Sequence, residues 1–411
     1  MDATTLFYLL VGIIVTSFII DKTVTILNTR HYNDQIPVEL ADVYDENEYQ
    51  KSQGYKKKNT QFSNISSLFS IILTLFFFFM EGFKLVDNFA ESFTAHPILS
   101  ALVFFGILMI GSSLLTIPFS YYKTFVIEES FGFNKSTRNL FWIDMIKGLI
   151  ITCFLGGGIL TMILWFFQIF GEKFWVYAWV LMAVFTLVMN LFYAKLILPL
   201  FNKQTPLENG ELKTAIEAYA NKVGFTLDAI FVIDGSKRST KANAYFSGFG
   251  SQKRITLFDT LINDLEISEI VAVLAHEVGH YKKKHLLFNL LTSLLLTGFM
   301  LFLLSLFVSM PLFSAALGIA VPKFHIGLIA FGILYSPISA VTGVFMNYVS
   351  RIFEYQADNY AKETYGSSPL IRALKKLSKN SLSNLTPHSA YVFMHYSHPT
   401  LFERIQNLKK E

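Results

Sequence analysis

Long apolar blocks alternate with charged segments along this chain. Seven blocks come close to the roughly 20 residues that a helix needs to cross a bilayer. The first block lacks the basic leader and small-residue cleavage site of a signal peptide, so we expect it to be a retained span. The pattern predicts an α-helical polytopic membrane protein with about seven transmembrane helices, at about 5–21, 64–86, 98–121, 140–170, 174–198, 286–310 and 325–350.

Basic residues are distributed unevenly between the connecting segments, and this predicts an orientation. If the N-terminus lies outside, the inside segments are 22–63, 122–139, 199–285 and 351–411. These segments hold 29 of the 34 lysines and arginines. Cytoplasmic loops of membrane proteins carry such an excess, so we expect these four segments to face the cytoplasm.

The largest polar insert predicts a small α+β domain. An amphipathic helix is expected over 207–224, and short strands over 228–234, 243–246 and 254–259, where β-branched and aromatic residues are frequent. Apolar residues recur at helical spacing from about Ser268 onward. We expect this last helix to run on through 281–285 into the sixth span.

These patterns divide the chain into four expected parts. Residues 1–198 form an N-terminal membrane domain of five spans. A cytoplasmic insert follows over 199–285, then spans six and seven over 286–350. Residues 351–411 form a C-terminal cytoplasmic segment.

The insert contains the pentapeptide His276-Glu277-Val278-Gly279-His280, which reads HExxH. A helix places positions four apart on one face, so both histidines can bind one metal ion. Glu277 then lies where it can take a proton from a water molecule at the metal. This arrangement is typical of a zinc peptidase. The alternative is a chance pentapeptide in a chain with nine histidines.

A catalytic zinc ion normally has a third protein ligand. Glu354 is the best candidate, in a helical segment that follows the seventh span. Asp358 lies four residues later and can accept a hydrogen bond from the outer ring nitrogen of a ligand histidine, such as His276. The alternative is a solvated Glu/Asp pair on a helix surface.

The segment 397–404 contains His398 and Arg404, either of which could stabilise an oxyanion near the metal. The alternative is a helix cap with His398 on the surface. His285 falls on another helix face than His280 and is not expected to be a ligand. The remaining histidines have no metal-binding spacing and are expected to be structural: His31, His96, His325, His388 and His395.

The composition supports these interpretations and excludes others. Apolar residues make up 53% of the chain and charged residues 16%, against about 25% charged in soluble domains. The single cysteine, Cys153, lies in an apolar block, so an intrachain disulfide and a cysteine-based zinc site are excluded. The chain has no basic stripe interleaved with aromatics, so nucleic acid is not an expected partner.

The chain resembles the type I CaaX prenyl endopeptidases, which are integral-membrane zinc metalloproteases of the gluzincin class. The resemblance covers essentially the whole length, and it is carried by five segments in this order: VIEESFGFNKST (126–137), DGSKRSTKANAYF (234–246), LAHEVGH (274–280), RIFEYQAD (351–358) and SHPTLFER (397–404).

The resemblance implies a role for each matching residue. His276, His280 and Glu354 would bind one Zn²⁺ ion, and Glu277 would be the general base. His398 and Arg404 would stand near the metal, with His398 stabilising the transition state. An edge strand would pair with the extended substrate through Asn243, Ala244 and Tyr245.

The resemblance also implies a water-filled chamber within the seven helices. Such a chamber would suit the polar residues Asp144, Lys147 and Lys195 inside the predicted spans. Alternatively, Asp144 and Lys147 pair with each other and Lys195 reaches the membrane surface.

The expected function is zinc-dependent hydrolysis of peptide bonds near the C-terminus of prenylated, CaaX-type proteins or related membrane-associated proteins. The expected partners are a peptide or protein substrate and the lipid bilayer. One alternative is a membrane quality-control protease without a lipid requirement, and another is a seven-span transporter or receptor with structural zinc. Phe-rich spans and Lys/Asn-rich loops favour a bacterial inner membrane over the endoplasmic reticulum membrane, with the catalytic side cytoplasmic.

Overall fold

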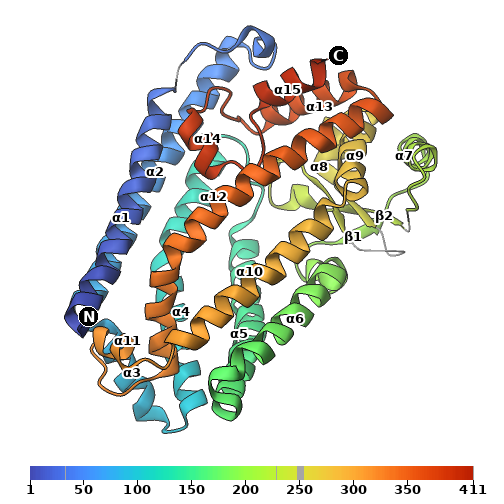
Figure 1. The fold of residues 1–411 in the computed structure, drawn as a ribbon. Coiled ribbons are helices and arrows are strands. Elements are labelled where there is room, and N and C mark those ends of the chain that lie inside the picture. The colour runs from blue at the N-terminus through green and yellow to red at the C-terminus, as the bar shows by residue number, and fades with distance from the viewer. Residues whose placement is uncertain (33, 228, 248–253, 411) are drawn as a thin grey trace.

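The computed structural model describes residues 1–32, 34–227, 229–247 and 254–410. The chain is mostly helical, with a small sheet near one end (Figure 1). The long apolar helices are α1 (Ala3–Arg30), α2 (Glu46–Phe79), α4 (Pro97–Tyr122), α5 (Arg138–Phe170), α6 (Phe174–Leu196), α10 (His285–Phe307) and α12 (Phe324–Thr364).

The structure confirms a polytopic helical membrane protein. Within the described ranges, six stretches are long and apolar enough to cross a membrane. One of them, Arg138–Leu200, contains both α5 and α6, which are joined by a short turn, Gly171–Lys173. Counting α5 and α6 separately gives the expected seven spans. The second span ends earlier than predicted, because Glu81 adopts a left-handed conformation and α3 (Gly82–Phe93) begins there.

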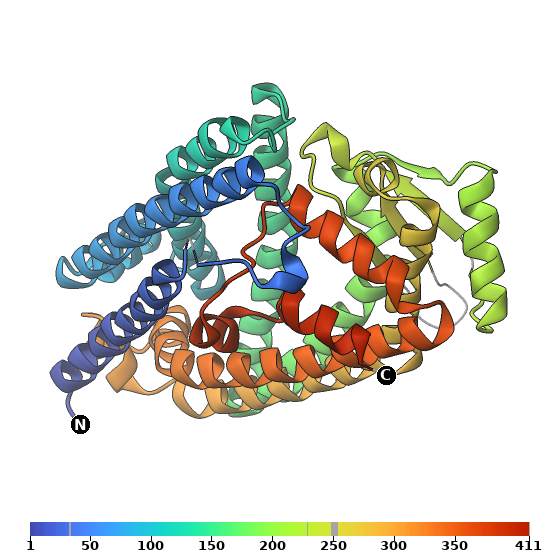
Figure 2. The same ribbon diagram turned by 90° about the horizontal axis from the view of Figure 1, so that it is seen from above.

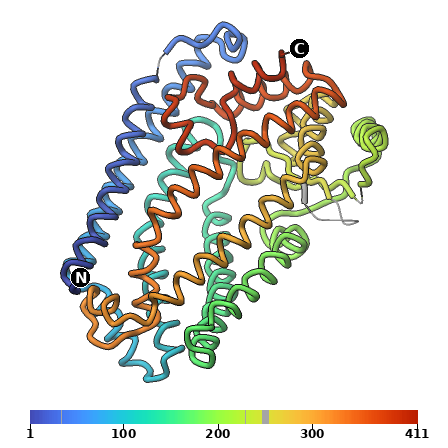
Figure 3. Tube along the Cα trace, viewed as in Figure 1, coloured from blue at the N-terminus to red at the C-terminus, as the bar shows by residue number. Residues whose placement is uncertain are grey.

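The spans pack against each other mainly at the end of the molecule that holds the N-terminus (Figure 3). Because successive spans alternate in direction, this core joins the first turns of some helices to the last turns of others. Farther along, the helices spread apart (Figures 1 and 2), and at most 22% of any span's most apolar window is buried. This arrangement agrees with seven helices around a chamber. The core includes Leu6, Phe78, Phe104, Phe174, Leu304 and Ile326.

A four-stranded sheet lies at the opposite end, in the order β1-β2-β4-β3. Three strands fall where the sequence predicts them: β2 (Ala229–Ile233), β3 (Ala244–Ser247) and β4 (Arg254–Phe258). The short strand β1 (Gln204–Pro206) was not predicted. β4 pairs in parallel with β2 and antiparallel with β3. β3 is therefore an edge strand, with one side not paired within the sheet.

Helices α7 (Glu211–Lys222), α8 (Asp259–Asp264) and α9 (Ile267–Lys282) pack with this sheet. Their shared core contains Ile216, Leu257, Ile270 and Leu274, all nearly inaccessible to solvent. Burying a side chain of this size contributes about 1.5–3 kcal/mol, so α9 is held firmly against the strands. Three helices complete this end: α13 (Ser367–Asn380), α14 (Ser389–His395) and α15 (Leu401–Lys409). The short helix α11 (Pro311–Ala316) lies at the other end of the molecule.

Ion pairs connect the membrane helices to the segment that leads into β3. Arg238 forms a bidentate pair with Asp144 of α5, at 2.8 and 2.9 Å. Lys241 binds Glu128 at 2.9 Å. Lys147 instead donates to the carbonyl oxygen of Leu200. The alternative that Asp144 and Lys147 pair with each other is therefore wrong, and Asp144 fixes the approach to the edge strand.

Candidate metal centre and active site

Two helices carry the predicted metal ligands. α9 begins with a capping box between Glu266 and Glu269 and carries His276 and His280. It ends at Lys282, and the left-handed residue Lys284 turns the chain before α10 starts at His285. The expectation that this helix continues into the sixth span is therefore wrong. The predicted segment around Glu354 belongs to the last turns of α12, which runs for 41 residues from the membrane region to α9.

The side chains of His276, His280 and Glu354 converge. His276 Nε2 lies 3.1 Å from His280 Nε2. The two Glu354 oxygens lie 3.3 Å from His276 Nε2 and 3.2 Å from His280 Nε2. Ligand atoms about 2.1 Å from one tetrahedral zinc ion are about 3.4 Å apart. One atom of each residue could therefore bind the same ion.

The hydrogen bonds around this cluster also fit a metal ion. Each histidine uses Nδ1 for another side chain, Asp358 for His276 and His285 for His280, so both Nε2 atoms point at the same place. Two facing imidazole nitrogens without a cation between them are unfavourable neighbours. Glu354 Oε2 is buried and accepts no hydrogen bond among the described residues. A divalent cation would satisfy all three donor groups.

Asp358 and Arg404 lie on the Nδ1 side of the His276 ring. Asp358 Oδ1 is 2.8 Å from His276 Nδ1, and the Arg404 guanidinium binds both oxygens of Asp358, at 2.6 and 2.9 Å. Arg404 Nη1 also lies 3.6 Å from Glu354 Oε2. Burial lowers the pKa of His276, but its hydrogen bonds with Asp358 and Glu354 outweigh this and raise it to about 9. A metal at Nε2 therefore competes with a proton.

His285 was not predicted to take part in the site. The turn at Lys284 brings its Nδ1 to 3.0 Å from His280 Nδ1, while its Nε2 lies 2.9 Å from Gln356 Oε1. If His280 donates from Nδ1, His285 accepts at Nδ1 and donates from Nε2 to Gln356. Helical spacing from His280 could not reveal this contact, because the chain leaves the helix between the two residues.

Glu277 lies between the metal cluster and the edge strand. A small cavity of about 10 Å³ is lined by Glu277 together with Ala244 and Tyr245 of β3. Asn243, the third residue predicted to bind substrate, directly precedes β3 and accepts a hydrogen bond from the Ala244 amide. Burial raises the pKa of the Glu277 carboxyl, which brings it closer to neutral pH.

His398 lies next to the cluster, in the segment that precedes α15. Its Nε2 is 3.3 Å from Glu354 Oε1, and its side chain is 61% exposed. It also lines a cavity of about 850 Å³. An exposed imidazole beside the three donor groups is accessible to a substrate. Its neighbour Arg404 is turned instead toward Glu354 and Asp358.

Gly279 permits the close packing of α9 on α12. A Cβ atom at this position would lie 3.0 Å from the Ala357 Cα and 3.1 Å from the Ala357 carbonyl oxygen. Contacts this short with backbone atoms would force the helices apart. The glycine within HExxH therefore keeps the two histidines within reach of Glu354.

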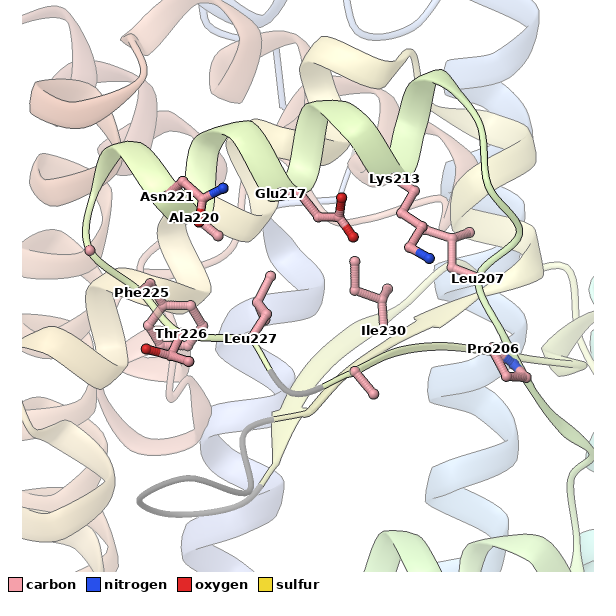
Figure 4. A pocket seen from close by; sticks show the side chains of 12 residues that line it. Pro206, Leu207, Lys213, Glu217, Ala220, Asn221, Phe225, Thr226, Leu227 and Ile230 are labelled. Atoms are coloured by element: carbon pink, nitrogen blue, oxygen red, sulfur yellow. The ribbon is translucent and has the colours of Figure 1, made fainter.

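A further cavity, of about 590 Å³, lies between α7 and β2 (Figure 4). Lys213, Glu217 and Leu227 are among the side chains around it. The figure shows the side chains of Lys213 and Glu217 extending from α7, with Leu227 facing them, and none of the predicted site residues lines this cavity. It does not belong to the site described above.

The fold and the site together define a class. Three ligand groups for one metal ion and a partly buried glutamate beside an open strand edge are the parts of a metallopeptidase, and here they are carried by a seven-span membrane protein. Residues 25–203 match the family described as "CAAX prenyl protease N-terminal, five membrane helices", and residues 206–411 match peptidase family M48. The chain therefore belongs to the CAAX prenyl protease group of peptidase family M48.

Related sequences and a solved structure match this chain over nearly its full length. CAAX prenyl protease 1 of Saccharomyces cerevisiae is 38% identical, with 91% of this chain and 88% of the relative aligned. The homologue from Homo sapiens is 33% identical, over 91% and 88%. The crystal structure of S. mikatae Ste24p superposes with a TM-score of 0.94 at 36% identity, over 98% of this chain and 99% of that one. The resemblance inferred from the sequence is confirmed, and the chain is a membrane-embedded metalloendopeptidase.

Proposed function

We propose that this protein uses Zn²⁺ to hydrolyse peptide bonds near the C-terminus of prenylated, CaaX-type proteins or related membrane-associated proteins. The observation that carries the proposal is the convergence of His276, His280 and Glu354 next to Glu277. The proposed substrate is supported by relatives that are named CAAX prenyl protease 1. The proposed partners are the peptide or protein substrate and the bilayer, without nucleic acid.

Zinc bound by His276, His280 and Glu354 would supply Lewis-acid activation of water at neutral pH. The Glu277 carboxylate then takes the proton of the attacking water and passes it to the leaving amine. The raised pKa of Glu277 suits both transfers. His398 Nε2 donates a hydrogen bond to the oxyanion that develops on the scissile carbonyl.

Other residues position these groups. Asp358 and Arg404 hold the tautomer and ring orientation of His276, so we assign them a positioning role rather than contact with the substrate. Asn243, Ala244 and Tyr245 offer the substrate backbone the unpaired side of β3. Main-chain pairing there leaves the scissile carbonyl beside Glu277.

Matched peptides test the proposed substrate. The purified protein in detergent should release the C-terminal tripeptide from a farnesylated CaaX peptide, detected by mass spectrometry, and cleave the unfarnesylated peptide much more slowly. The second candidate, a quality-control protease, is favoured if both peptides are cleaved at the same rate. Absence of cleavage of either peptide by the zinc-loaded protein would contradict the proposed activity.

The catalytic end of the molecule is proposed to face the cytoplasm. The basic residues of 22–63, 199–285 and 351–411 support this orientation. The bacterial inner membrane remains the location that the sequence favours over the endoplasmic reticulum membrane, although the relatives named above are eukaryotic. We also propose that the chain divides at 198, 285 and 350 into an N-terminal membrane domain, a cytoplasmic metalloprotease insert with the HExxH helix, spans six and seven, and a C-terminal cytoplasmic segment that completes the zinc site.

His285 should support metal binding without being a ligand. Replacing His285 with Ala removes the acceptor of the His280 Nδ1 proton, and loss of such an outer partner typically lowers metal affinity about 10- to 100-fold. Competition with a zinc chelator measures this directly. His96 lies outside the metal centre, at the start of α4, so His96→Ala is the matched control. Equal affinity in His285→Ala and the wild type would refute the support role.

A further inference from the structure

The cavity that His398 lines has basic side chains in its wall and no acidic ones. It is bounded by α1, by residues 55–66 of α2, by the end of α4 and by the segments around α13 and α14. Lys56 and Lys123 line it, together with His395 and His398, and none of its lining residues is acidic. Most of its other lining groups are hydroxyls and amides. Such a cavity favours an anion and disfavours an apolar chain.

Lys56 is the buried lysine of this cavity. Its side chain lies in the wall with only 7% of its surface exposed. Its Nζ donates to the neutral Asn384 side chain at 2.9 Å and lies 5.9 Å from the Tyr32 ring. Among the described residues, no carboxylate comes within 4.0 Å of it. A buried ammonium group without an opposite charge is costly, and a bound anion would remove that cost.

We propose that this cavity binds the C-terminal carboxylate of the substrate, and of the peptide released from it, through Lys56. The inference rests on the proposed function. Hydrolysis near a C-terminus adds water across the scissile bond and releases a short peptide with a new amino group at one end. The original carboxylate stays at the other end, and this charged end is common to every CaaX substrate.

The size and position of the cavity fit such a peptide. His398, which borders the metal centre, and Lys56 belong to the same cavity of about 850 Å³. A sphere of that volume is about 12 Å across, and an extended tripeptide spans about 10 Å. A tripeptide with its amino end at His398 can therefore present its carboxylate to Lys56. The farnesyl chain, which is apolar, would have to bind elsewhere.

Two matched substrates test the proposal through the ratio of their kcat/KM values. Farnesylated CaaX peptides with a free C-terminal carboxylate or a C-terminal amide are offered to wild type and to Lys56→Met. Met has nearly the same helix propensity as Lys and a similar length. Wild type should prefer the acid over the amide about 10- to 100-fold in kcat/KM, as for one hydrogen bond to a charged group. Lys56→Met should lose most of that preference.

Lys57→Met is the matched control, because Lys57 is exposed on the same helix and does not line the cavity. It should keep the wild-type preference. Inhibition by the product tripeptide, as acid or as amide, gives a second readout that follows the same ratio. Zinc content and thermal unfolding, measured for every variant, show that each protein is folded.

The outcomes separate the two proposals. If wild type cleaves both peptides equally well, the carboxylate site is refuted while the proposed function stands. If Lys56→Met slows both peptides by the same factor, Lys56 does not read the carboxylate and the inference is again refuted. If zinc-loaded wild type cleaves neither peptide, the proposed function fails and the inference fails with it.

Discussion

Replacing Glu277 with Gln should leave the metal centre intact and remove most of the peptidase activity. Glutamine keeps the size and polarity of the side chain but cannot accept a proton from water. Glu277 is adjacent in sequence to His276, yet it lines the small cavity at β3 rather than joining the three converging donor groups. Loss of a general base lowers the rate about 10²- to 10⁴-fold.

Two measurements make this result specific. Metal analysis of Glu277→Gln should give the same zinc content as wild type, and cleavage of a farnesylated CaaX peptide should fall. Glu208→Gln changes an exposed glutamate in the same insert and should behave as wild type. Full activity of Glu277→Gln would remove Glu277 from the role of general base.

Much of this molecule could be predicted from its sequence because the relevant signals are local. Apolar block length predicted seven spans, and α4, α5 and α6 begin or end within two residues of the expected limits. HExxH spacing requires only one helix, and α9 provides it. The placement of Glu354 and Asp358 on one face of α12 follows from their spacing in the same way.

The remaining features depend on contacts between distant segments or on single backbone torsions. The break at Lys284 falls on the last of three consecutive lysines, with no proline or glycine among them, so no turn signal indicated it, and His285 was missed as a consequence. Asp144 was compared with its helical neighbour Lys147, whereas its partner Arg238 is 94 positions away. The cavity around Lys56, which no acidic residue lines, combines residues from four parts of the chain. No sequence pattern connects these parts.

Glu354 offers the sharpest test of the proposed ligand set. Replacing it with Ala removes one of three converging donor groups, so the affinity for zinc should fall by more than the 10- to 100-fold expected for an outer partner such as His285. Activity should fall in parallel at limiting zinc. Chelator competition on both variants gives their order, and the ligand should rank above its supporting residue.

The fold should survive this change, which keeps the test interpretable. Arg404 retains its bidentate pair with Asp358, so removal of Glu354 does not leave the buried guanidinium without an opposite charge. Glu363 is exposed on the same helix, and Glu363→Ala should bind zinc as wild type does. If Glu354→Ala bound zinc with unchanged affinity and stoichiometry, the third ligand would have to come from another residue. The proximity of Glu354 to both histidines would then reflect helix packing alone.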